Sequence, residues 1–397
     1  MQIRTQVAII GAGPAGLMLG ALLAKRGVDS VIVEAKSRAY IEQRIRAGVL
    51  EQGSVDAMHE VGAGERMRAQ GLIHDGAILR FAGRSHRIDF RALTGKAVTI
   101  YGQHELVRDL VAHRLAADLP LLFEVDDVKI DAKIDAKIDA PRVRFRHGGE
   151  DVELVCEAIA GCDGFHGVAR AAVPNLTIYE REYPFSWLGI LADAAPSSHE
   201  LVYAHHERGF ALLSMRSPEV SRLYLQCAAH EDLAAWSDAR IWDELAVRLA
   251  ADGFVLRSGP ITQRSITPMR SFVAEPMRHG RLALAGDAAH IVPPTGAKGL
   301  NLAIADARLL ADALTALCRG DERLLDAYSE TCLRRVWKVE RFSAWMTNLL
   351  HRHDDPRDDP ATAAFKRRIQ EAELDYLASS VAAQTTLAEN YVGLPLA

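Results

Sequence analysis

The stretch that decides the fold is Val7-Ala-Ile-Ile10, followed directly by Gly11-Ala-Gly13-Pro-Ala-Gly16. A short apolar run that ends at a glycine predicts a buried strand. Residues 15–26 are rich in helix formers, and Gly27 stands where a left-handed helix cap belongs. The predicted order is therefore strand, glycine-rich turn, helix.

The glycines of this turn have the GxGxxG spacing of a dinucleotide-binding loop. Gly11 permits the tight turn, Gly13 lets a pyrophosphate approach the backbone, and Gly16 lets helix and strand pack closely. Ser30-Val-Ile-Val-Glu34 predicts the second strand of a parallel βαβ unit, with Glu34 placed to accept hydrogen bonds from ribose hydroxyls. The motif in this context predicts an adenine dinucleotide site, with a plain tight turn as the alternative.

Length and charge limit the classes of protein to which the chain can belong. The 397 residues are 49% hydrophobic and carry 47 Lys and Arg against 52 Asp and Glu, a net charge of −5. This composition predicts a folded chain of roughly two to three domains. We expect neither nucleic acid nor a membrane as partner, because both favour a basic surface. Small molecules that bind in mostly buried sites therefore remain as the expected ligands.

Residues 7–24 resemble a signal peptide because they are uncharged and follow Arg4, but glycines and a proline interrupt them repeatedly. The five cysteines show neither CxxC spacing nor histidine partners at zinc-like intervals. We therefore expect no metal site, no disulfide framework and a cytoplasmic location.

The pattern along the chain predicts an α/β fold in three parts. Alternating residues with turn signals between 183 and 226 predict an antiparallel or mixed sheet. A buried strand returns at 281–285, and amphipathic helices follow at 300–317 and 322–351. The parts are a Rossmann-like dinucleotide-binding domain at 1–180, a substrate domain at 181–268, and a region at 269–397 that rejoins the first domain and ends in helices.

Two segments stand out by composition. KIDAKIDAKIDA at 129–140 repeats with a period of four, too short for a solenoid, and is interpreted as the tip of a surface hairpin. HRHDDPRDDP at 351–360 gathers potential metal ligands, yet its prolines and alternating charges favour a solvated loop between helices.

The predicted sheet domain carries a group of polar residues. Ser214 and Arg216 share a strand face with Leu212, because residues two apart point the same way. A symmetric hairpin about Glu219 sets Tyr224 opposite Ser214. A guanidinium, a hydroxyl and a phenol on an apolar wall form a receptor for the carboxylate of an aromatic acid. An exposed arginine on a polar face is the alternative.

Two more glycine–aspartate segments follow apolar runs, Cys162-Asp163-Gly164 and Gly286-Asp287, and the second leads into PPTGAKGLN at 293–301. With GxGxxG, these motifs resemble, in order, those of the class A flavoprotein monooxygenases. The resemblance covers nearly the whole chain and includes RIRAGVLEQG at 44–53 and ENYVGLP at 389–395.

This resemblance implies an aromatic hydroxylase with non-covalent FAD and with NADPH or NADH as co-substrate. The implied reaction converts 4-hydroxybenzoate to 3,4-dihydroxybenzoate through a flavin C4a-hydroperoxide. The implied partners are a small aromatic acid, O₂ and a second copy of the chain, bound through the C-terminal helices.

The resemblance also implies the residues that hold FAD. Glu34 meets the adenosine ribose, Asp287 meets the ribityl chain, and Arg222 touches a flavin that moves between buried and exposed placements. For Asp287 a helix N-cap is the alternative. The helix start at 299–301 independently offers N–H groups and a positive dipole end to a reduced flavin. The implied set is Gly11, Gly13, Gly16, Glu34, Arg44, Arg46, Gln103, Asp163, Arg222, Asp287, Gly299, Leu300 and Asn301.

The implied substrate contacts are Ser214, Arg216, Tyr224, Tyr203 and the Pro294 carbonyl. A relay is implied in which Tyr203 meets the phenol oxygen, Tyr391 meets Tyr203, and His74, near the surface, exchanges the proton with solvent. Removing the phenol proton raises electron density at the ring carbon to be hydroxylated. From the residues alone, each tyrosine is more often a core aromatic whose hydroxyl has a partner, and His74 is a surface histidine.

No second Rossmann unit is predicted for the nicotinamide nucleotide. The implied contacts are Tyr40, Arg44, His166 and Arg270. Ala35 departs from the family, which commonly has arginine after the position of Glu34. The loss of that cation weakens selection for a 2′-phosphate, although Lys36 and Arg38 can compensate.

Two other classes fit the same motifs. A flavin-dependent halogenase or reductase shares the fold, but the halogenase WxW motif is absent from the sequence. A dinucleotide-binding protein without chemistry, such as a prenyl-binding chaperone, is the other. The Ser214, Arg216 and Tyr224 group argues against both.

Overall fold

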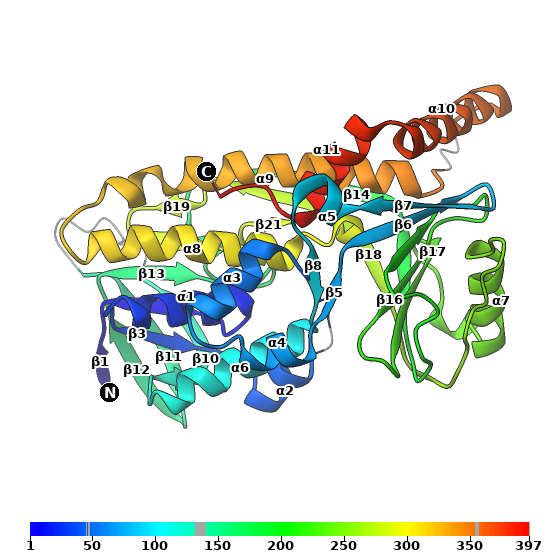
Figure 1. Ribbon diagram of the computed structural model, residues 1–397. Coiled ribbons are helices and arrows are strands. Elements are labelled where there is room, and N and C mark those ends of the chain that lie inside the picture. Colours follow the sequence, from blue (N-terminus) through cyan, green and yellow to red (C-terminus); the bar gives the residue numbers. More distant parts are fainter. Residues whose placement is uncertain (45, 47, 132–139, 354–356, 397) are drawn as a thin grey trace.

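A computed structural model describes residues 1–44, 46, 48–131, 140–353 and 357–396 (Figure 1). One half of the molecule is built on a six-stranded sheet in the order β19-β20-β13-β2-β3-β9. Its strands are β2 (Val7–Ile10), β3 (Ser30–Val33), β9 (Leu121–Leu122), β13 (Ala158–Gly161), β19 (Arg278–His279) and β20 (Leu282–Leu284). All neighbours are parallel except β19 and β20. The predicted βαβ unit is confirmed.

Helix α1 (Pro14–Lys25) connects β2 to β3 and packs against α6 (Gln103–Ala116) and α8 (Gly299–Leu317). It ends before Gly27, whose φ of +72° is the left-handed conformation expected there. Every residue of β2 and β3 is buried, which is why both strands are apolar almost throughout.

Smaller elements surround this sheet. A three-stranded sheet contains β4 (Val49–Leu50), β8 (Val98–Ile100) and β5 (Leu72–His74), and a four-stranded sheet contains β1 (Gln2–Arg4), β12 (Glu150–Val155), β11 (Arg142–His147) and β10 (Asp126–Ile130). The short helices are α2 (Arg38–Gln43), α3 (Gln52–Glu60), α4 (Glu65–Gln70) and α5 (Phe90–Thr94). Strands β10 and β11 pair antiparallel, but residues 132–139 of the KIDA repeat lie outside the described residues.

The other half is an eight-stranded sheet in the order β21-β18-β14-β17-β16-β15-β6-β7. Its strands are β6 (Gly76–Phe81), β7 (Arg84–Asp89), β14 (Thr177–Ala192), β15 (Leu201–Ala204), β16 (Ala211–Met215), β17 (Ser221–Ala228), β18 (Ile261–Glu275) and β21 (His290–Ile291). The β15–β6 pair is parallel, so the sheet is mixed. The domain boundary at 180 stays a prediction, although β6 and β7, from within 1–180, join this sheet.

Each face of the eight-stranded sheet has its own apolar core. Helix α7 (Asp238–Arg248) covers one face, where Leu188, Leu213 and Leu223 pack with Ile241 and Leu245. The opposite face packs against the C-terminal helices α9 (Arg323–Leu350), α10 (Pro360–Ser379) and α11 (Val381–Val392). Figure 1 shows α9 running along the top of both halves. The predicted C-terminal helical region is confirmed.

The segment at 351–360 joins α9 to α10, as predicted, but it is not solvated throughout. His351 is completely buried and stacks on Phe185 and Phe210. The prediction was wrong for this residue because composition does not show that the first residue after α9 still packs against the eight-stranded sheet. Among the described residues, no helix is long and apolar enough to cross a membrane.

Candidate cofactor and substrate site

The three glycine motifs meet at one edge of the six-stranded sheet. Gly11 follows β2, Asp163 follows β13 and Gly286 follows β20, and these three strands are parallel neighbours. The N–H of Cys162 donates to the Ile10 carbonyl at 2.8 Å. Strand order reverses between β2 and β13, and ligands of such sheets bind at the carboxyl ends of strands beside that reversal.

Two glycines of the first turn, Gly11 and Gly16, have no space for a side chain, whereas Gly13 faces open space. Gly11 has φ +101°, and a Cβ there would lie 2.3 Å from the Cys162 carbonyl oxygen. A Cβ on Gly16 would lie 2.0 Å from the Gly11 carbonyl oxygen, whereas one on Gly13 meets nothing within 4 Å. Helix α1 begins at Pro14 with no side-chain cap. Its open N-terminus fits a pyrophosphate.

The acidic residues of the motifs surround this turn. Glu34, directly after β3, accepts hydrogen bonds from the N–H groups of Ala12 and Lys36, each at 2.8 Å. The remaining lone pairs of this carboxylate are available to ribose hydroxyls. Asp163 Oδ2 accepts from the Ala169 N–H, while its buried Oδ1 has no partner among the described residues. Asp287 is exposed and does not cap α8, whose N-cap is Lys298.

The flavin side of the predicted site is framed by the starts of two helices. Gln103 is the first residue of α6, and α8 begins at Gly299 without a side-chain cap, so its first N–H groups are open. The Asn301 side chain is used within the protein: its Oδ1 accepts from Glu51 N and Ser54 Oγ, and its Nδ2 donates to two carbonyls. Only the backbone of Asn301 is left to meet a cofactor.

The substrate residues lie in a row across the eight-stranded sheet. Tyr203 on β15 is opposite Leu212 on β16, which is opposite Tyr224 on β17. Ser214 is opposite Arg222, so the predicted pairing of Ser214 with Tyr224 was wrong. The Arg216 N–H donates to Val220 O, which centres the hairpin on Pro218 rather than Glu219 and shifts the partner strand by two residues. A shift of two keeps all these side chains on the predicted face.

Two arginines bracket the phenol of Tyr224. Arg216 donates to the carbonyls of Met215 at 2.9 Å and Arg46 at 3.3 Å, and both Arg216 and Arg222 hydrogen-bond the Tyr224 side chain. Arg222 lies with its guanidinium carbon 5.0 Å from the Tyr224 ring centroid, and its buried Nε and Nη1 have no partner in the described chain. Burial raises the pKa of Tyr224, but Arg222 and Arg216 together outweigh it and lower the net pKa. The surplus positive charge suits a carboxylate.

The other end of the row carries a pair of phenols. The Tyr203 and Tyr391 hydroxyls are 2.5 Å apart, and both side chains are 2% exposed. Burial raises the pKa of each above its ordinary range. Tyr391 stacks on Phe90 of α5, and the Lys298 ammonium holds its carbonyl at 2.9 Å. The structure therefore brings together two residues that are 188 positions apart.

His74 does not lie near the surface as expected. It is 1% exposed, its Nε2 lies 3.3 Å from Met215 Sδ, and its Nδ1 has no partner among the described residues. Burial lowers its pKa to about 4. Strand alternation explains the error, because Ile73 takes the outward position on β5 with 65% exposure. No hydrogen bond joins His74 to either tyrosine in the described part of the chain. The Pro294 carbonyl accepts from Ala297 N at 2.9 Å and retains a second lone pair.

The four residues predicted for the nicotinamide nucleotide fall into two groups. Tyr40 is 47% exposed on α2, with the Arg44 guanidinium 5.9 Å from its ring centroid. His166 and Arg270 both contact Phe165, edge-on and by a cation–π contact respectively. Arg270 also faces Glu180 at 3.5 Å. No direct contact between the two groups is found among the described residues.

A buried ionic group was not predicted from the sequence. Lys298, within the quoted PPTGAKGLN, donates to Glu51 Oε1 at 2.7 Å, and Arg335 lies 3.3 Å from Glu51 Oε2. All three side chains are at least nine-tenths buried, so they tie α9, the start of α8 and the segment after β4 together. The available signal was an isolated lysine in an otherwise apolar and glycine-rich string.

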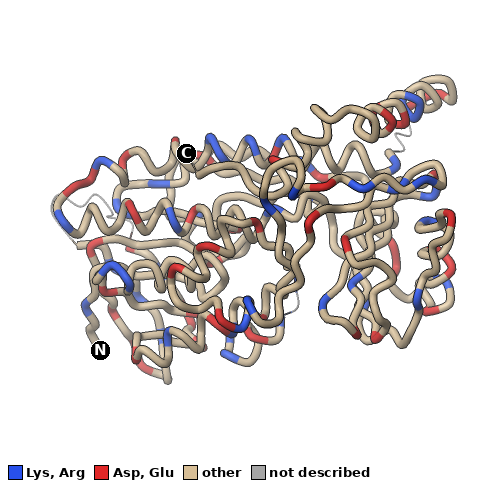
Figure 2. The backbone as a smooth tube through the Cα atoms, in the orientation of Figure 1, with Lys and Arg blue, Asp and Glu red and all other residues tan. Residues whose placement is uncertain are grey.

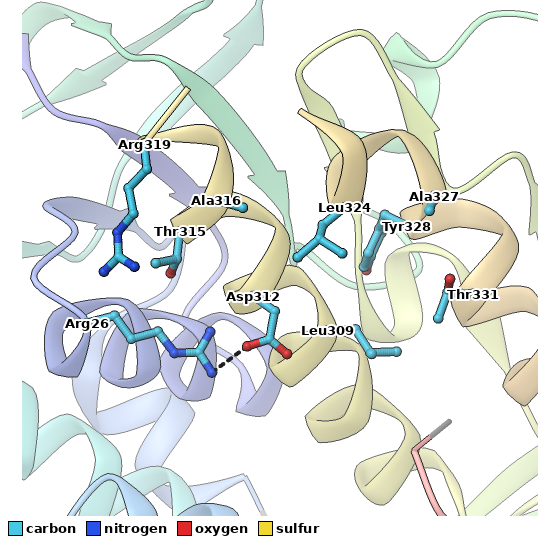
Figure 3. Close-up of a pocket in the computed structure, with 10 residues that line it drawn as sticks. All are labelled: Arg26, Leu309, Asp312, Thr315, Ala316, Arg319, Leu324, Ala327, Tyr328 and Thr331. Atoms are coloured by element: carbon cyan, nitrogen blue, oxygen red, sulfur yellow. Dashed lines mark ion pairs between the residues drawn. The ribbon is translucent and has the colours of Figure 1, made fainter. Parts of the chain in front are cut away.

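Two open hollows lie away from these residues. One, of about 510 Å³, lies between α8, α9 and the end of α1, where Arg26 and Asp312 form an ion pair at 2.8 Å (Figure 3). Another, of about 1010 Å³, lies beside the β6–β7 hairpin and α10. Neither is lined by a predicted site residue, so the site is defined by its motifs and the tyrosine row.

Comparison with known proteins agrees with this geometry. A model of the FAD binding domain family matches residues 4–343. The chain therefore belongs to this family of FAD-dependent enzymes, and within it to the class A aromatic hydroxylases.

Among individual relatives, p-hydroxybenzoate hydroxylase of Acinetobacter baylyi is 50% identical over 99% of this chain and 96% of its own length. 6-Hydroxy-3-succinoylpyridine 3-monooxygenase of Pseudomonas putida is 26% identical over 88% of this chain and 90% of its own. The crystal structure of p-nitrophenol 4-monooxygenase from Pseudomonas putida matches the fold with a TM-score of 0.81 at 20% identity, covering 99% of both chains.

Proposed function

We propose that this chain hydroxylates 4-hydroxybenzoate at C3, giving 3,4-dihydroxybenzoate. One O₂ and one NAD(P)H are consumed with a proton, and NAD(P)⁺ and water are released. The observation that carries the proposal is the row Tyr203, Leu212 and Tyr224, which separates a phenol pair from a guanidinium pair on one apolar wall. Across two strand spacings these groups lie roughly 10 Å apart at the backbone, a gap that a benzoate with a para oxygen can bridge.

The carboxylate end is supplied by Arg216, Arg222, Ser214 and Tyr224. The unpartnered guanidinium atoms there offer charge-assisted hydrogen bonds to an anion. Leu212 lies between the two ends and offers an apolar contact to the ring. Orientation follows, because only one end of the molecule carries a negative charge at neutral pH.

The phenol end is where the protein controls ionisation. The Tyr203 hydroxyl accepts a hydrogen bond from the substrate oxygen or donates one to it, and the Tyr391 hydroxyl holds the Tyr203 hydroxyl in place. Stabilising the phenolate raises electron density at the adjacent ring carbon. Since His74 is buried without a bond to either tyrosine, we propose that proton exchange with solvent requires water or a movement that links His74 to Tyr391.

FAD, held by the three motifs, supplies the activation of O₂ and the transfer of one oxygen atom. Gly13 and the start of α1 would hold its pyrophosphate, Glu34 its ribose, and the start of α8 its ring end. The covered wall formed by Phe210, Leu212 and Trp187 excludes water from the reacting carbon.

We also propose a cytoplasmic homodimer assembled through the C-terminal helices. Phe365, Ile369 and Tyr376 lie on α10 and are 57–67% exposed. Basic and acidic segments are interleaved over both halves of the molecule (Figure 2), which does not suit a nucleic-acid partner. Light scattering after gel filtration tests the dimer, and a monomer at micromolar concentration would contradict it.

The test of the main proposal is the rate at which NAD(P)H bleaches the bound flavin, with and without 4-hydroxybenzoate. We expect the acid to bind and to accelerate bleaching, and benzoate, which lacks the para oxygen, to do so far less. A protein that binds FAD but shows no spectral response to 4-hydroxybenzoate would contradict the proposal.

A further inference from the structure

A buried histidine at the end of α9 packs on the same face of the eight-stranded sheet as the proposed substrate residues, against Phe210 and Trp187. His351 follows α9 directly and is 0% exposed. Its Nε2 lies 2.6 Å from the indole nitrogen of Trp187 on β14. Its Nδ1 lies 2.9 Å from the Thr347 carbonyl oxygen.

The hydrogen bonds define which nitrogen of His351 carries the proton. An indole N–H can only donate, so Nε2 must accept and is unprotonated. Nδ1 then carries the hydrogen and donates to the Thr347 carbonyl. A proton on Nε2 would set two donors against each other, and burial lowers the His351 pKa to about 3. His351 is therefore neutral and fixed in one tautomer.

Trp187 connects this histidine to the substrate residues. Its ring stacks on Phe210 at 5.2 Å between centroids and lies 4.8 Å from the ring of Tyr224. Gly189, two residues along the same strand, is opposite Tyr224, and a Cβ there would lie 2.8 Å from Arg222 Nη2. The indole and the space over Gly189 thus determine where Tyr224 and Arg222 sit.

We propose that His351 is a positioning residue for the substrate carboxylate pocket: by accepting the Trp187 N–H, it holds the indole against Tyr224 and so holds Tyr224 beside Arg216 and Arg222. This inference rests on the proposed function and deepens it. It makes the end of α9 a determinant of substrate affinity, although His351 itself touches neither substrate nor cofactor.

The experiment compares His351→Leu with His351→Gln in the FAD-loaded enzyme. The leucine removes the acceptor and leaves a buried indole N–H unpaired, and the glutamine retains an acceptor oxygen. We expect His351→Leu to weaken 4-hydroxybenzoate binding about 10- to 100-fold in a flavin absorbance titration. FAD affinity should be unchanged, and His351→Gln should restore substrate affinity to within about threefold of wild type.

His205→Leu is the matched control. His205 is partly buried and hydrogen-bonds the Leu350 carbonyl through Nδ1, but no contact joins it to Trp187 among the described residues. It should lower thermal stability and leave substrate affinity near wild type. Equal losses of affinity in His205→Leu and His351→Leu would reduce His351 to a packing residue and overturn the inference.

Trp187→Phe removes the indole N–H donor, and it tests the inference if His351→Leu alone folds poorly. Adding His351→Leu to Trp187→Phe should then cause no further loss of substrate affinity, because no N–H remains to be held or left unpaired. Independent, additive effects would contradict the inference. If the wild type does not bind 4-hydroxybenzoate, both the proposed function and the inference are overturned. If the wild type binds it and His351→Leu binds it with the same affinity, only the inference is overturned.

Discussion

The cofactor edge and the substrate wall are built in different ways. At the cofactor edge, each of three short motifs directly follows one strand of a parallel sheet, and backbone groups form most of the binding surface. At the substrate wall, Tyr203, Ser214 and Tyr224 come from three strands, Arg216 directly follows one of these strands, and Tyr391 comes from a helix near the C-terminus. The first region depends on glycine geometry, and the second depends on the register and packing of distant side chains.

This difference determines what a substitution does. A side chain added at Gly11 or Gly16 of the cofactor edge collides with backbone, so the fold is destabilised and the cofactor is lost together with it. A side chain removed from the substrate wall leaves the strands paired, so the ligand is lost and the fold is kept.

The largest effect is expected for Gly11→Ala. The new Cβ would lie 2.3 Å from the Cys162 carbonyl oxygen in a residue with φ +101°. Backbone strain and the collision together should lower the free energy of unfolding by about 3 kcal/mol. FAD should no longer be retained through gel filtration. Gly27→Ala is the control, because φ is +72° but nothing lies within 4 Å. It should cost about 1 kcal/mol and keep the cofactor.

Arg216→Ala should give the next largest effect. We expect 4-hydroxybenzoate binding to weaken by roughly 2–4 kcal/mol, since a buried carboxylate loses its charged partner, with FAD binding unchanged. Arg264→Ala on β18 is the control, because Arg264 pairs with Asp238 away from the row. An unaltered substrate titration in Arg216→Ala would remove this arginine from the pocket.

Tyr391→Phe should separate ionisation from binding. The ring stays against Phe90, but Tyr203 loses the hydroxyl 2.5 Å away, so the pKa of the bound phenol should rise and hydroxylation should slow about tenfold. More NAD(P)H should then end as H₂O₂. Stopped-flow absorbance of bound substrate against pH measures this. Tyr183→Phe, whose hydroxyl meets Ser271, should behave as wild type.

Mild acid should destabilise the substrate side. Burial lowers the pKa of His74 to about 4 and of His351 to about 3. Below the unfolded value of about 6.5, the unfolded chain binds protons that the native chain does not, so the unfolding free energy falls as pH falls. Each histidine contributes about 1.4 kcal/mol per pH unit. Urea unfolding between pH 7 and 5 should show a shallower loss in His351→Gln than in wild type; equal slopes would mean that His351 takes up its proton over the same pH range in the native protein as in the unfolded chain.

The smallest change is expected for Ala35→Arg. A cation next to Glu34 should shift preference toward NADPH a few-fold, because it adds charge for a 2′-phosphate. Lys36 already lies 5.9 Å from the Tyr40 ring centroid, which limits the gain. The ratio of kcat/KM for the two nucleotides measures it, and Ala39→Arg on α2 is the control for added charge alone. An unchanged ratio in Ala35→Arg would show that this position does not read the phosphate.

The cofactor edge was the more predictable region because its signals are local. GxGxxG, Asp163 and Gly286 each sit within a few residues of the strand that places them. The substrate face was also predicted, from alternation along β16, but the hairpin register was wrong by two residues because turn closure at Arg216 and Val220 is not visible in alternation. Burial of His74 and His351 depends on layers from distant segments, which a local pattern does not contain.

The most direct test of the central claim is the product formed under ¹⁸O₂ with FAD, NAD(P)H and 4-hydroxybenzoate. The substrate wall predicts 3,4-dihydroxybenzoate with one ¹⁸O at C3, formed in step with NAD(P)H oxidation, and predicts that Arg216→Ala loses this product at the same substrate concentration. Recovery of unlabelled 4-hydroxybenzoate with all the reductant converted to H₂O₂ by the wild type would contradict the assignment.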